Sequence, residues 1–304
     1  MTGQILIIVV LGLVSGVALG SIYTMLAIGY NLVLAAAGIF NFAQGALVMA
    51  GTFLALYLGD RMGWPFAAAI AVTALTGAGL GLMTELVTVR PVMRRTTDLG
   101  LAAVITTLGL GLALVSGWAL LVGPDEQPVR SYVSTHPVFL GPIPIRPIYL
   151  VMAAAALVVA LATDTVLRRT MLGFTLRAVL EDPEGASLAG VDTPQVVRWI
   201  FAVAGVLAGV AGYLIAPVTQ ASPFVADQLG LYAFAAMTIG GFGSFAGALA
   251  GGLIVGVLTG EAAGFLNPHL TRPLVFLICL LVLLVRPGGI FGTRGIFGSR
   301  VRDI

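Results

Sequence analysis

The sequence contains no lysine, and all 15 of its basic residues are arginine. A P-loop needs a lysine on the nucleotide phosphates, and a Schiff-base enzyme needs a lysine as its nucleophile. The chain therefore cannot bind ATP through a Walker motif. If ATP drives its work, another polypeptide must supply the ATPase.

Cysteine and histidine are nearly absent as well. The one cysteine, Cys279, lies inside an apolar run, which excludes a disulfide or a cysteine metal site within the chain. The two histidines, His136 and His269, are far apart and fall in predicted loops, so we expect no metal site. The sequence has no paired carboxylates and no nucleophile beside a base. We therefore expect no catalytic residue, no cofactor and no intramembrane enzyme.

Charged residues of either sign are scarce. They make up 9% of the chain, whereas soluble domains carry about 25%. Hydrophobic residues make up 59%, and the mean hydropathy is +1.07. Apolar runs near or above the roughly 18 residues that cross a bilayer recur along the whole chain. The composition predicts an all-α, polytopic integral membrane protein in contact with membrane lipid, and a net charge of +2 gives no reason to expect a nucleic-acid partner.

We expect a single transmembrane domain over residues 1–304, with about eight membrane segments. The apolar runs that define these segments are 5–28, 32–58, 64–84, 99–122, 148–166, 199–218, 232–258 and 273–285. The 40 glycines are about twice the average frequency. Such a content suits helices that pack backbone to backbone in lipid.

The arginines predict the orientation of these segments. Eleven of the 15 lie in three places: the loop at 90–95, the loop at 168–198, and the tail at 286–302. The positive-inside rule places these three regions in the cytoplasm. The C-terminus is then cytoplasmic, and counting the segments backwards places the N-terminus outside.

The run 232–258 conflicts with this count, because a single crossing there would put the basic tail outside. Two short spans or a re-entrant pair remove the conflict. The centre of the run, 240–247 (GGFGSFAG), is where a helix would break most easily. We therefore predict an interrupted helix there, with four residues at or beside the interruption: Gly240, Gly241, Gly243 and Ser244.

A sequence pattern that occurs twice in the chain predicts a second interruption. The segment 42–47 (FAQGAL) and the segment 245–249 (FAGAL) share Phe-Ala and Gly-Ala-Leu, and both follow glycine-containing runs. Interrupted helices at corresponding places in two halves are typical of inverted-repeat transporters and point to their translocation path.

Three amides, Asn31, Asn41 and Gln44, lie inside or at the edge of apolar runs, where unpaired polar groups are costly. Such amides either line a pathway or bond neighbouring helices and broken backbone. We expect Asn41 and Gln44 to face a cavity, because they flank the predicted break. No carboxylate lies in the middle of a segment, which counts against a carrier driven by protons or sodium.

Two loops are long. The outer loop, 123–147, contains six prolines, which preclude a long helix and favour an extended cap. In the inner loop, 168–198, we predict a helix over 174–181, a second start at Asp182-Pro183, a C′ glycine at Gly190, and a cap with proline at Thr193-Pro194. The apolar side of this helix-turn-helix can fill a groove on a partner protein or lie on lipid headgroups. The residues of that side are Leu176, Val179, Leu180, Ala186 and Leu188.

The inner loop also carries a resemblance. The run 177–191, with RAVLEDPEGA and then Gly190-Val191, resembles the cytoplasmic coupling loop of permeases from the branched-chain (hydrophobic) amino-acid family of bacterial ABC importers. Further runs are similar to the same family: 20–32 (GSIYTMLAIGYNL), 240–249 (GGFGSFAGAL) and 286–292 (RPGGIFG). The family's Asn-Phe-Ala-His-Gly-Glu stretch is present here at 41–46 as NFAQGA, with glutamine in place of the usual histidine and alanine in place of the usual acid.

The resemblance implies a multi-pass permease subunit of the bacterial cytoplasmic (inner) membrane, without catalysis of its own. It implies a second, similar permease subunit, two ATPase subunits on the inner loops and an extracytoplasmic solute-binding protein. By the same resemblance, the ATPase-coupling element consists of Arg177, Glu181, Asp182, Pro183, Glu184 and Gly190. The residues expected to line or gate the path are Asn31, Asn41, Gln44, Gly45, Gly240, Gly241, Gly243 and Ser244.

The solute and one alternative stay open at this point. The two departures at 41–46 lie at the predicted break, and relatives of the family also carry urea, short amides and other small organic solutes. A stand-alone channel for a small neutral solute such as urea or an amide would also suit an uncharged interior. The inner helix-turn-helix discriminates between the two, because a channel has no need of it.

Overall fold

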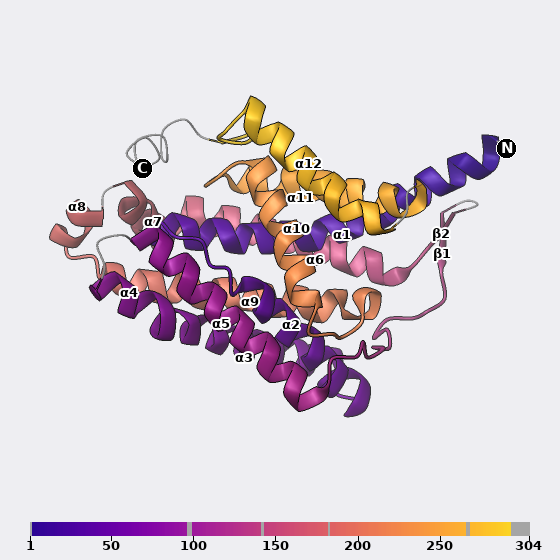
Figure 1. Cartoon of the computed structure of the whole chain (residues 1–304), viewed down its shortest axis with the longest axis horizontal. Helices are drawn as coiled ribbons and strands as arrows, with labels where there is room; N and C mark the ends of the chain where they lie inside the picture. Colours follow the sequence, from indigo (N-terminus) through magenta and orange to yellow (C-terminus); the bar gives the residue numbers. More distant parts are fainter. Residues whose placement is uncertain (1, 96–98, 141–142, 182, 266–267, 293–304) are drawn as a thin grey trace.

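The structure is a computed structural model that describes residues 2–95, 99–140, 143–181, 183–265 and 268–292. Most of its long helices run along one common direction, so the bundle has two distinct ends (Figure 1). The helices are α1 (Thr2–Ala37), α2 (Gln44–Leu54), α3 (Phe66–Thr84), α4 (Arg90–Arg95), α5 (Leu99–Val122), α6 (Pro147–Arg169), α7 (Met171–Glu181), α8 (Pro183–Leu188), α9 (Thr193–Thr219), α10 (Val225–Gly240), α11 (Phe245–Phe265) and α12 (Pro268–Val285). The π-helical turns η1 (Ala55–Arg61) and η2 (Glu85–Val89) extend α2 and α3, and the strands β1 (Val138–Leu140) and β2 (Ile143–Ile145) pair antiparallel.

The two ends carry different elements. One end carries α4, α7 and α8 (Figure 1). We call it the arginine-rich end, because Arg90 begins α4, Arg168 and Arg169 end α6, Arg177 lies in α7 and Arg198 lies in the first turns of α9. The other end, which we call the hairpin end, carries the N-terminal turns of α1 and the β1–β2 hairpin. The loop arginines that the sequence assigned to one side of the membrane therefore do lie at one end of the molecule.

Within the described residues, six helices are long and apolar enough to cross a bilayer, namely α1, α3, α5, α6, α9 and α11. The helix α12 has a shorter apolar stretch, Leu270–Val285. The polytopic all-α architecture is confirmed, whereas the predicted count of eight segments is not. The difference arises because α2 and α10 are the short partners of interrupted helices, with 11 and 16 residues.

The first two predicted segments have different boundaries in the structure. We expected one segment to end at residue 28 and the next to begin at residue 32, but α1 continues through this region to Ala37. No proline occurs in 2–37, and the Asn31 side chain bonds a distant loop rather than its own backbone. With 1.5 Å of rise per residue, the 36 residues of α1 span about 54 Å.

Close glycine contacts hold α1 against α11. A methyl group on Gly256 of α11 would lie 2.2 Å from the Cα of Gly20, and one on Gly16 would lie 2.7 Å from the Cα of Val257. The two helices therefore touch backbone to backbone, as the high glycine content predicts.

The helix α9 lies at the centre of the bundle. Its most apolar stretch is the most buried of the six spans, and that of α5 is the least buried. Glycines again set the contacts, because Gly205 packs on Gly77 of α3 and Gly209 packs on Gly51 of α2. The exposed apolar surface of α3, α5 and α6 is what helices in contact with lipid require.

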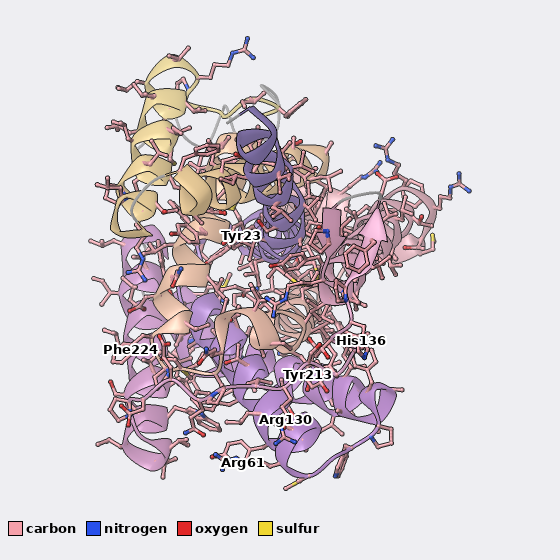
Figure 2. The ribbon with its side chains drawn as sticks, turned by 90° about the vertical axis from the view of Figure 1, so that its right-hand side faces the viewer. Tyr23, Arg61, Arg130, His136, Tyr213 and Phe224 are labelled. Carbon is pink, nitrogen blue, oxygen red and sulfur yellow. The ribbon has the colours of Figure 1, made fainter. Side chains whose placement is uncertain are left out.

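Between α5 and α6, the chain lies against the hairpin end as an extended segment with one short hairpin. A two-residue bridge joins Gln127 to Ala221, the Arg61 guanidinium donates to Gln127 Oε1 at 2.6 Å, and Arg130 lies 3.5 Å from the Asp60 carboxylate. Figure 2 looks at the molecule from this end and labels Arg61 and Arg130. The segment is thus tied both to η1 and to the chain that follows α9.

Tyr132 anchors the same segment on α9. Its ring stacks on Tyr213 with centroids 5.1 Å apart, and its hydroxyl donates to the carbonyl oxygens of Tyr213 and Leu214, at 2.7 and 2.6 Å. Pro217 lies four residues after Tyr213 and has no N–H, so the Tyr213 carbonyl lacks its helical donor. Burial, together with the nearby Tyr213, raises the pKa of Tyr132 well above its usual range, which keeps the phenol protonated as a donor.

Candidate functional site

The predicted interruption near Asn41 is present and lies between α1 and α2. The helix α1 ends at Ala37, Gly38 adopts a positive φ of 68°, and α2 begins at Gln44. Asn41 Oδ1 accepts a hydrogen bond from the Ala43 amide at 3.1 Å, and Asn41 Nδ2 lies 3.4 Å from Gln44 Oε1. The asparagine thereby supplies an acceptor to the start of α2, which has four amides without helical partners. We call the segment 38–43 the first break.

Gln44 fastens the first break to the central helix. Its Nε2 donates to the carbonyl oxygen of Ala204 on α9 at 3.0 Å. The side chains of Asn41 and Gln44 are each 1% exposed. In this structure both amides are buried in protein and hydrogen-bonded, so their observed role is to hold the break. Their place in a translocation path stays a prediction.

The predicted interruption at the glycine run 240–247 lies between α10 and α11. The helix α10 ends at Gly240, and both Gly241 and Gly243 have positive φ, at 118° and 73°. Only glycine adopts such angles at little cost. Ser244 Oγ accepts from the Gly247 amide at 3.0 Å and so caps the start of α11. We call the segment 241–244 the second break.

Asn31 of α1 holds the second break. Its Oδ1 accepts from the Gly243 amide at 3.0 Å, and its Nδ2 donates to the Ser244 carbonyl oxygen at 3.2 Å. One fully buried amide therefore gives the Gly243 amide its acceptor. It also adds a second donor to the Ser244 carbonyl oxygen, which already accepts from the Ala248 amide. A long continuous helix is what places this residue beside a loop more than 200 positions away.

A cavity of about 350 Å³ lies beside the first break, and we call it the first-break cavity. Its walls come from α1, the first break, α2, α5, α10 and α12. Gly45 is the residue of the predicted path that lines it, next to Phe42 and Ala46. Gly45 also sets its shape, because a methyl group there would lie 2.3 Å from the carbonyl oxygen of Ala226 on α10.

A larger cavity of about 660 Å³ lies beside the second break, and we call it the second-break cavity. Gly243 and Ser244 line it, together with residues of α1, α6, α7 and α11. It is also lined by Arg177 and by the ion pair of Arg168 with Asp164, whose Nε and Oδ1 atoms are 2.6 Å apart. The two predicted interruptions therefore each border a cavity.

Four phenylalanines lie between the two breaks, and we call them the phenylalanine cluster. Phe40 and Phe42 come from the first break, Phe242 comes from the second, and Phe234 comes from α10. The Phe40 ring centroid lies 5.7 Å from that of Phe234 and 5.8 Å from that of Phe242. Sequence reasoning did not single out this cluster, although the presence of phenylalanine at both interruptions was a usable signal.

The inner loop forms two helices, as predicted, but its apolar side is used differently. Leu176 and Val179 of α7 are buried within this chain, and so is Ala186 of α8. This part of the apolar side is therefore not available to a partner. Leu188, the last residue of α8, is 90% exposed, and Met171 and Phe174 of α7 are exposed as well.

The end of α8 has the predicted geometry. Gly190 has a positive φ of 89°, its amide donates to the Ser187 carbonyl oxygen, and the Val191 amide donates to that of Ala186. These two bonds define a Schellman motif, which fixes the chain direction after the helix. The next cap is one residue earlier than predicted, because Asp192 rather than Thr193 accepts from the Gln195 amide, at 3.0 Å.

Several residues of the predicted coupling element cannot be placed by the structure. Asp182 lies outside the described residues, and the side chains of Glu181, Pro183 and Glu184 lie outside the described side chains. Arg177 is described and lines the second-break cavity, and Gly190 closes α8.

Comparisons with known proteins show which family the chain resembles. The family model for the permease component of branched-chain amino-acid transport systems matches residues 12–284. The high-affinity branched-chain amino-acid transport system permease protein LivH of Escherichia coli K12 is 31% identical, over 91% of this chain and 94% of its own length. BraD, the corresponding permease protein of Pseudomonas aeruginosa, is 28% identical, over 92% of this chain and 94% of its own.

More distant similarity reaches archaeal and sugar permeases. A probable branched-chain amino-acid transport permease protein of Methanocaldococcus jannaschii is 27% identical over 90% of this chain. The fructose import permease protein FrcC of Rhizobium meliloti is 33% identical over 40% of this chain. No solved structure matches the chain.

Proposed function

The chain belongs to the family of permease components of branched-chain amino-acid transport systems, and on that premise we propose that it is the transmembrane subunit of an ABC importer for branched-chain or other hydrophobic amino acids. It forms one transmembrane permease domain in the bacterial cytoplasmic membrane. The arginine-rich end faces the cytoplasm and the hairpin end faces outside, as the positive-inside rule requires. The solute enters at the hairpin end.

The observation that carries the proposal is the pair of interrupted helices with a cavity at each. Half-helices joined by unwound backbone, buried in protein rather than in lipid, are the way in which transporters build sites within a membrane. The path runs from the first-break cavity to the second-break cavity. Asn31, Asn41 and Gln44 hold the two breaks, and Gly45, Gly243 and Ser244 line the cavities.

The phenylalanine cluster is the gate between the two cavities. Phe42 and Phe234 line the first-break cavity, and Phe242 is adjacent in sequence to Gly243, which lines the second. Apolar side chains close a path to water and to polar solutes. Because both breaks contribute to the cluster, a change at either break moves the gate.

The loop that contains α7 and α8 couples the chain to ATPase subunits. It carries Arg177, Glu181, Asp182, Pro183, Glu184 and Gly190, the residues that the resemblance assigns to this role. The Schellman motif at Gly190 holds the tip rigid, and exposed Leu188 is the apolar anchor that enters a groove on the ATPase. The complete importer contains a second, similar permease subunit, two ATPase subunits and an extracytoplasmic solute-binding protein.

Reconstitution tests the function. We expect proteoliposomes that contain all these subunits to take up leucine only with ATP inside and binding protein outside. Omitting the ATPase subunits should abolish uptake. Leucine or urea uptake by this chain alone, without nucleotide, would instead favour a stand-alone channel.

A substitution at Leu188 tests the coupling loop. Leu188→Asp should leave expression and membrane insertion unchanged, because the side chain is almost fully exposed, and should weaken ATPase co-purification about tenfold or more. Met171→Asp is the matched control, since Met171 is also exposed at the start of α7. Equal retention of the ATPase by both variants would show that α8 is not the docking element.

A further inference from the structure

The first-break cavity contains one acidic and one basic residue among its lining side chains. These are Asp227, in the first turn of α10, and Arg272, in the first turns of α12. The remaining walls are apolar, aromatic or glycine, apart from the Tyr30 phenol. The two charges belong to neighbouring chain segments, because Arg272 Nη2 donates to the side chain of Gln228, the residue after Asp227, at 3.2 Å.

Neither charge is matched by an opposite charge. In the described part of the chain, the ion pairs are Arg130 with Asp60 and Arg168 with Asp164. Arg272 instead contacts the neutral Gln228 amide and the Tyr232 phenol. Asp227 accepts no hydrogen bond from the described residues, and both Asp227 and Arg272 are exposed rather than buried.

An exposed charge beside apolar walls gains more from an opposite charge than it would in open water, because the effective dielectric constant is lower there. A ligand that carries both a carboxylate and an ammonium group supplies a partner to each of these two residues. Arginine suits the carboxylate in particular, because its planar fork can donate two parallel hydrogen bonds. Aspartate is an acceptor with full charge and suits the ammonium group.

The other walls define the rest of the ligand. Phe42, Leu108, Leu112, Leu231 and Phe234 offer apolar surface in the same cavity. The volume of about 350 Å³ is at the lower end of the roughly 300–1,000 Å³ that small-molecule sites occupy. The cavity therefore offers two opposite charges and an apolar wall to a small solute.

We propose that the first-break cavity is a binding site for a zwitterionic α-amino acid with an aliphatic side chain. Arg272 binds the α-carboxylate, Asp227 binds the α-ammonium group, and the side chain lies against the apolar wall next to Phe42 and Phe234. This inference rests on the proposed transport function and adds to it that this subunit itself recognises the amino-acid head. Delivery by a binding protein alone would not require these charges.

Protection of a cysteine from modification tests the site in the assembled complex. The single natural cysteine is replaced by alanine, and Leu112→Cys places a reporter on the cavity wall. We expect leucine to slow modification by a small neutral methanethiosulfonate. Two analogues should protect about tenfold more weakly, because each lacks one charge-assisted contact: 4-methylpentanoate lacks the ammonium group and 3-methylbutylamine lacks the carboxylate.

Charge variants and a matched reporter complete the test. Arg272→Gln and Asp227→Asn should each abolish protection by leucine, and Arg272→Lys should restore part of it, because the charge returns without the fork. A reporter at Leu101→Cys, on the same helix but outside the cavity, should be unaffected by leucine. Unchanged protection in both charge variants, or equal protection by leucine and the two analogues, would overturn the proposal.

The outcome separates this inference from the proposed function. If the wild-type complex takes up leucine with ATP but leucine does not protect the reporter, the site is wrong and the transport function stands. If the wild-type complex shows no uptake with all partners present, the transport function itself fails.

Discussion

Tyr132 shows how a single side chain can complete a helix in another part of the chain. Pro217 deprives the Tyr213 carbonyl of its donor inside α9, and the Tyr132 hydroxyl occupies that position from the extended segment between α5 and α6. An unsatisfied backbone group inside a membrane protein costs free energy. The proline and the tyrosine therefore form one unit, although they are 85 positions apart.

Removing the hydroxyl should destabilise the protein. Tyr132→Phe keeps the ring stacked on Tyr213 but leaves the carbonyl oxygens without this donor, so we expect a loss of about 1–3 kcal/mol. The midpoint of thermal unfolding of the purified chain in detergent measures the loss. Tyr149→Phe is the control, because the Tyr149 hydroxyl has no hydrogen bond among the described residues, and its midpoint should not change.

A double-mutant cycle tests the link to the proline. Pro217→Ala restores an N–H to the helix, so Tyr132→Phe should cost less in that background than in the wild type. Additive effects of the two substitutions would show that the tyrosine does not act as the substitute donor.

Sequence reasoning identified the important amides but could not identify their partners. Asn31, Asn41 and Gln44 stood out because polar groups are rare in apolar runs. The partner of Asn31 is a loop 212 positions away, and the partner of Gln44 is a carbonyl on α9. Local pattern contains no information on such pairs. For the same reason Asp227 and Arg272 were not recognised as neighbours.

The interrupted helices were the elements that the sequence predicted best. Glycines are intrinsically poor in helices and can adopt positive φ, so the run 240–247 marked the second break directly. The predicted segment boundary between residues 28 and 32 was wrong, because the polar groups of Asn31 are satisfied by the second break and do not end α1. Tertiary contacts, not local propensity, decide whether such a residue ends a helix.

The close contact of α1 with α11 depends on glycines, which have no side chain at the point where the two backbones meet. Gly256→Ala would place a methyl group 2.2 Å from the Cα of Gly20, and backbone cannot move aside as a flexible side chain can. We expect a destabilisation of about 1–3 kcal/mol or more, as for other overpacked interiors. Thermal unfolding in detergent, together with the yield of folded protein, measures it.

The matched control lies on an outward-facing helix. Gly109 of α5 has nothing within 4 Å of the position that a methyl group would take. Gly109→Ala should leave stability unchanged or raise it slightly, because alanine favours the helix. Similar losses for Gly109→Ala and Gly256→Ala would show that glycine content, rather than the close contact, supports the fold.

At the scale of the whole molecule, loop arginines that are far apart in the sequence lie together at the arginine-rich end. We predict from it that the arginine-rich end is cytoplasmic. Two exposed methionines lie on opposite sides: Met171 at the start of α7, and Met62, which directly follows η1. Because Cys279 is buried, cysteines introduced at these positions report with little background once it is replaced.

A membrane-impermeant thiol reagent should distinguish the two ends in intact spheroplasts. Met62→Cys should react at once, and Met171→Cys should react only after permeabilisation. The reverse pattern would invert the topology and place the α7–α8 loop outside, where no ATPase could reach it.

The buried side of α7 has a mechanical consequence. Leu176 and Val179 are buried, and α7 contacts α1, α6 and α9. A displacement of α8 would therefore move the helices of the bundle, because α7 is packed against them. One of these helices is α1, whose Asn31 side chain is hydrogen-bonded to the second break. If ATPase subunits dock on this loop as we propose, a nucleotide-driven movement of α8 would reach the interior along α1, and Asn31 would pass it to the second break.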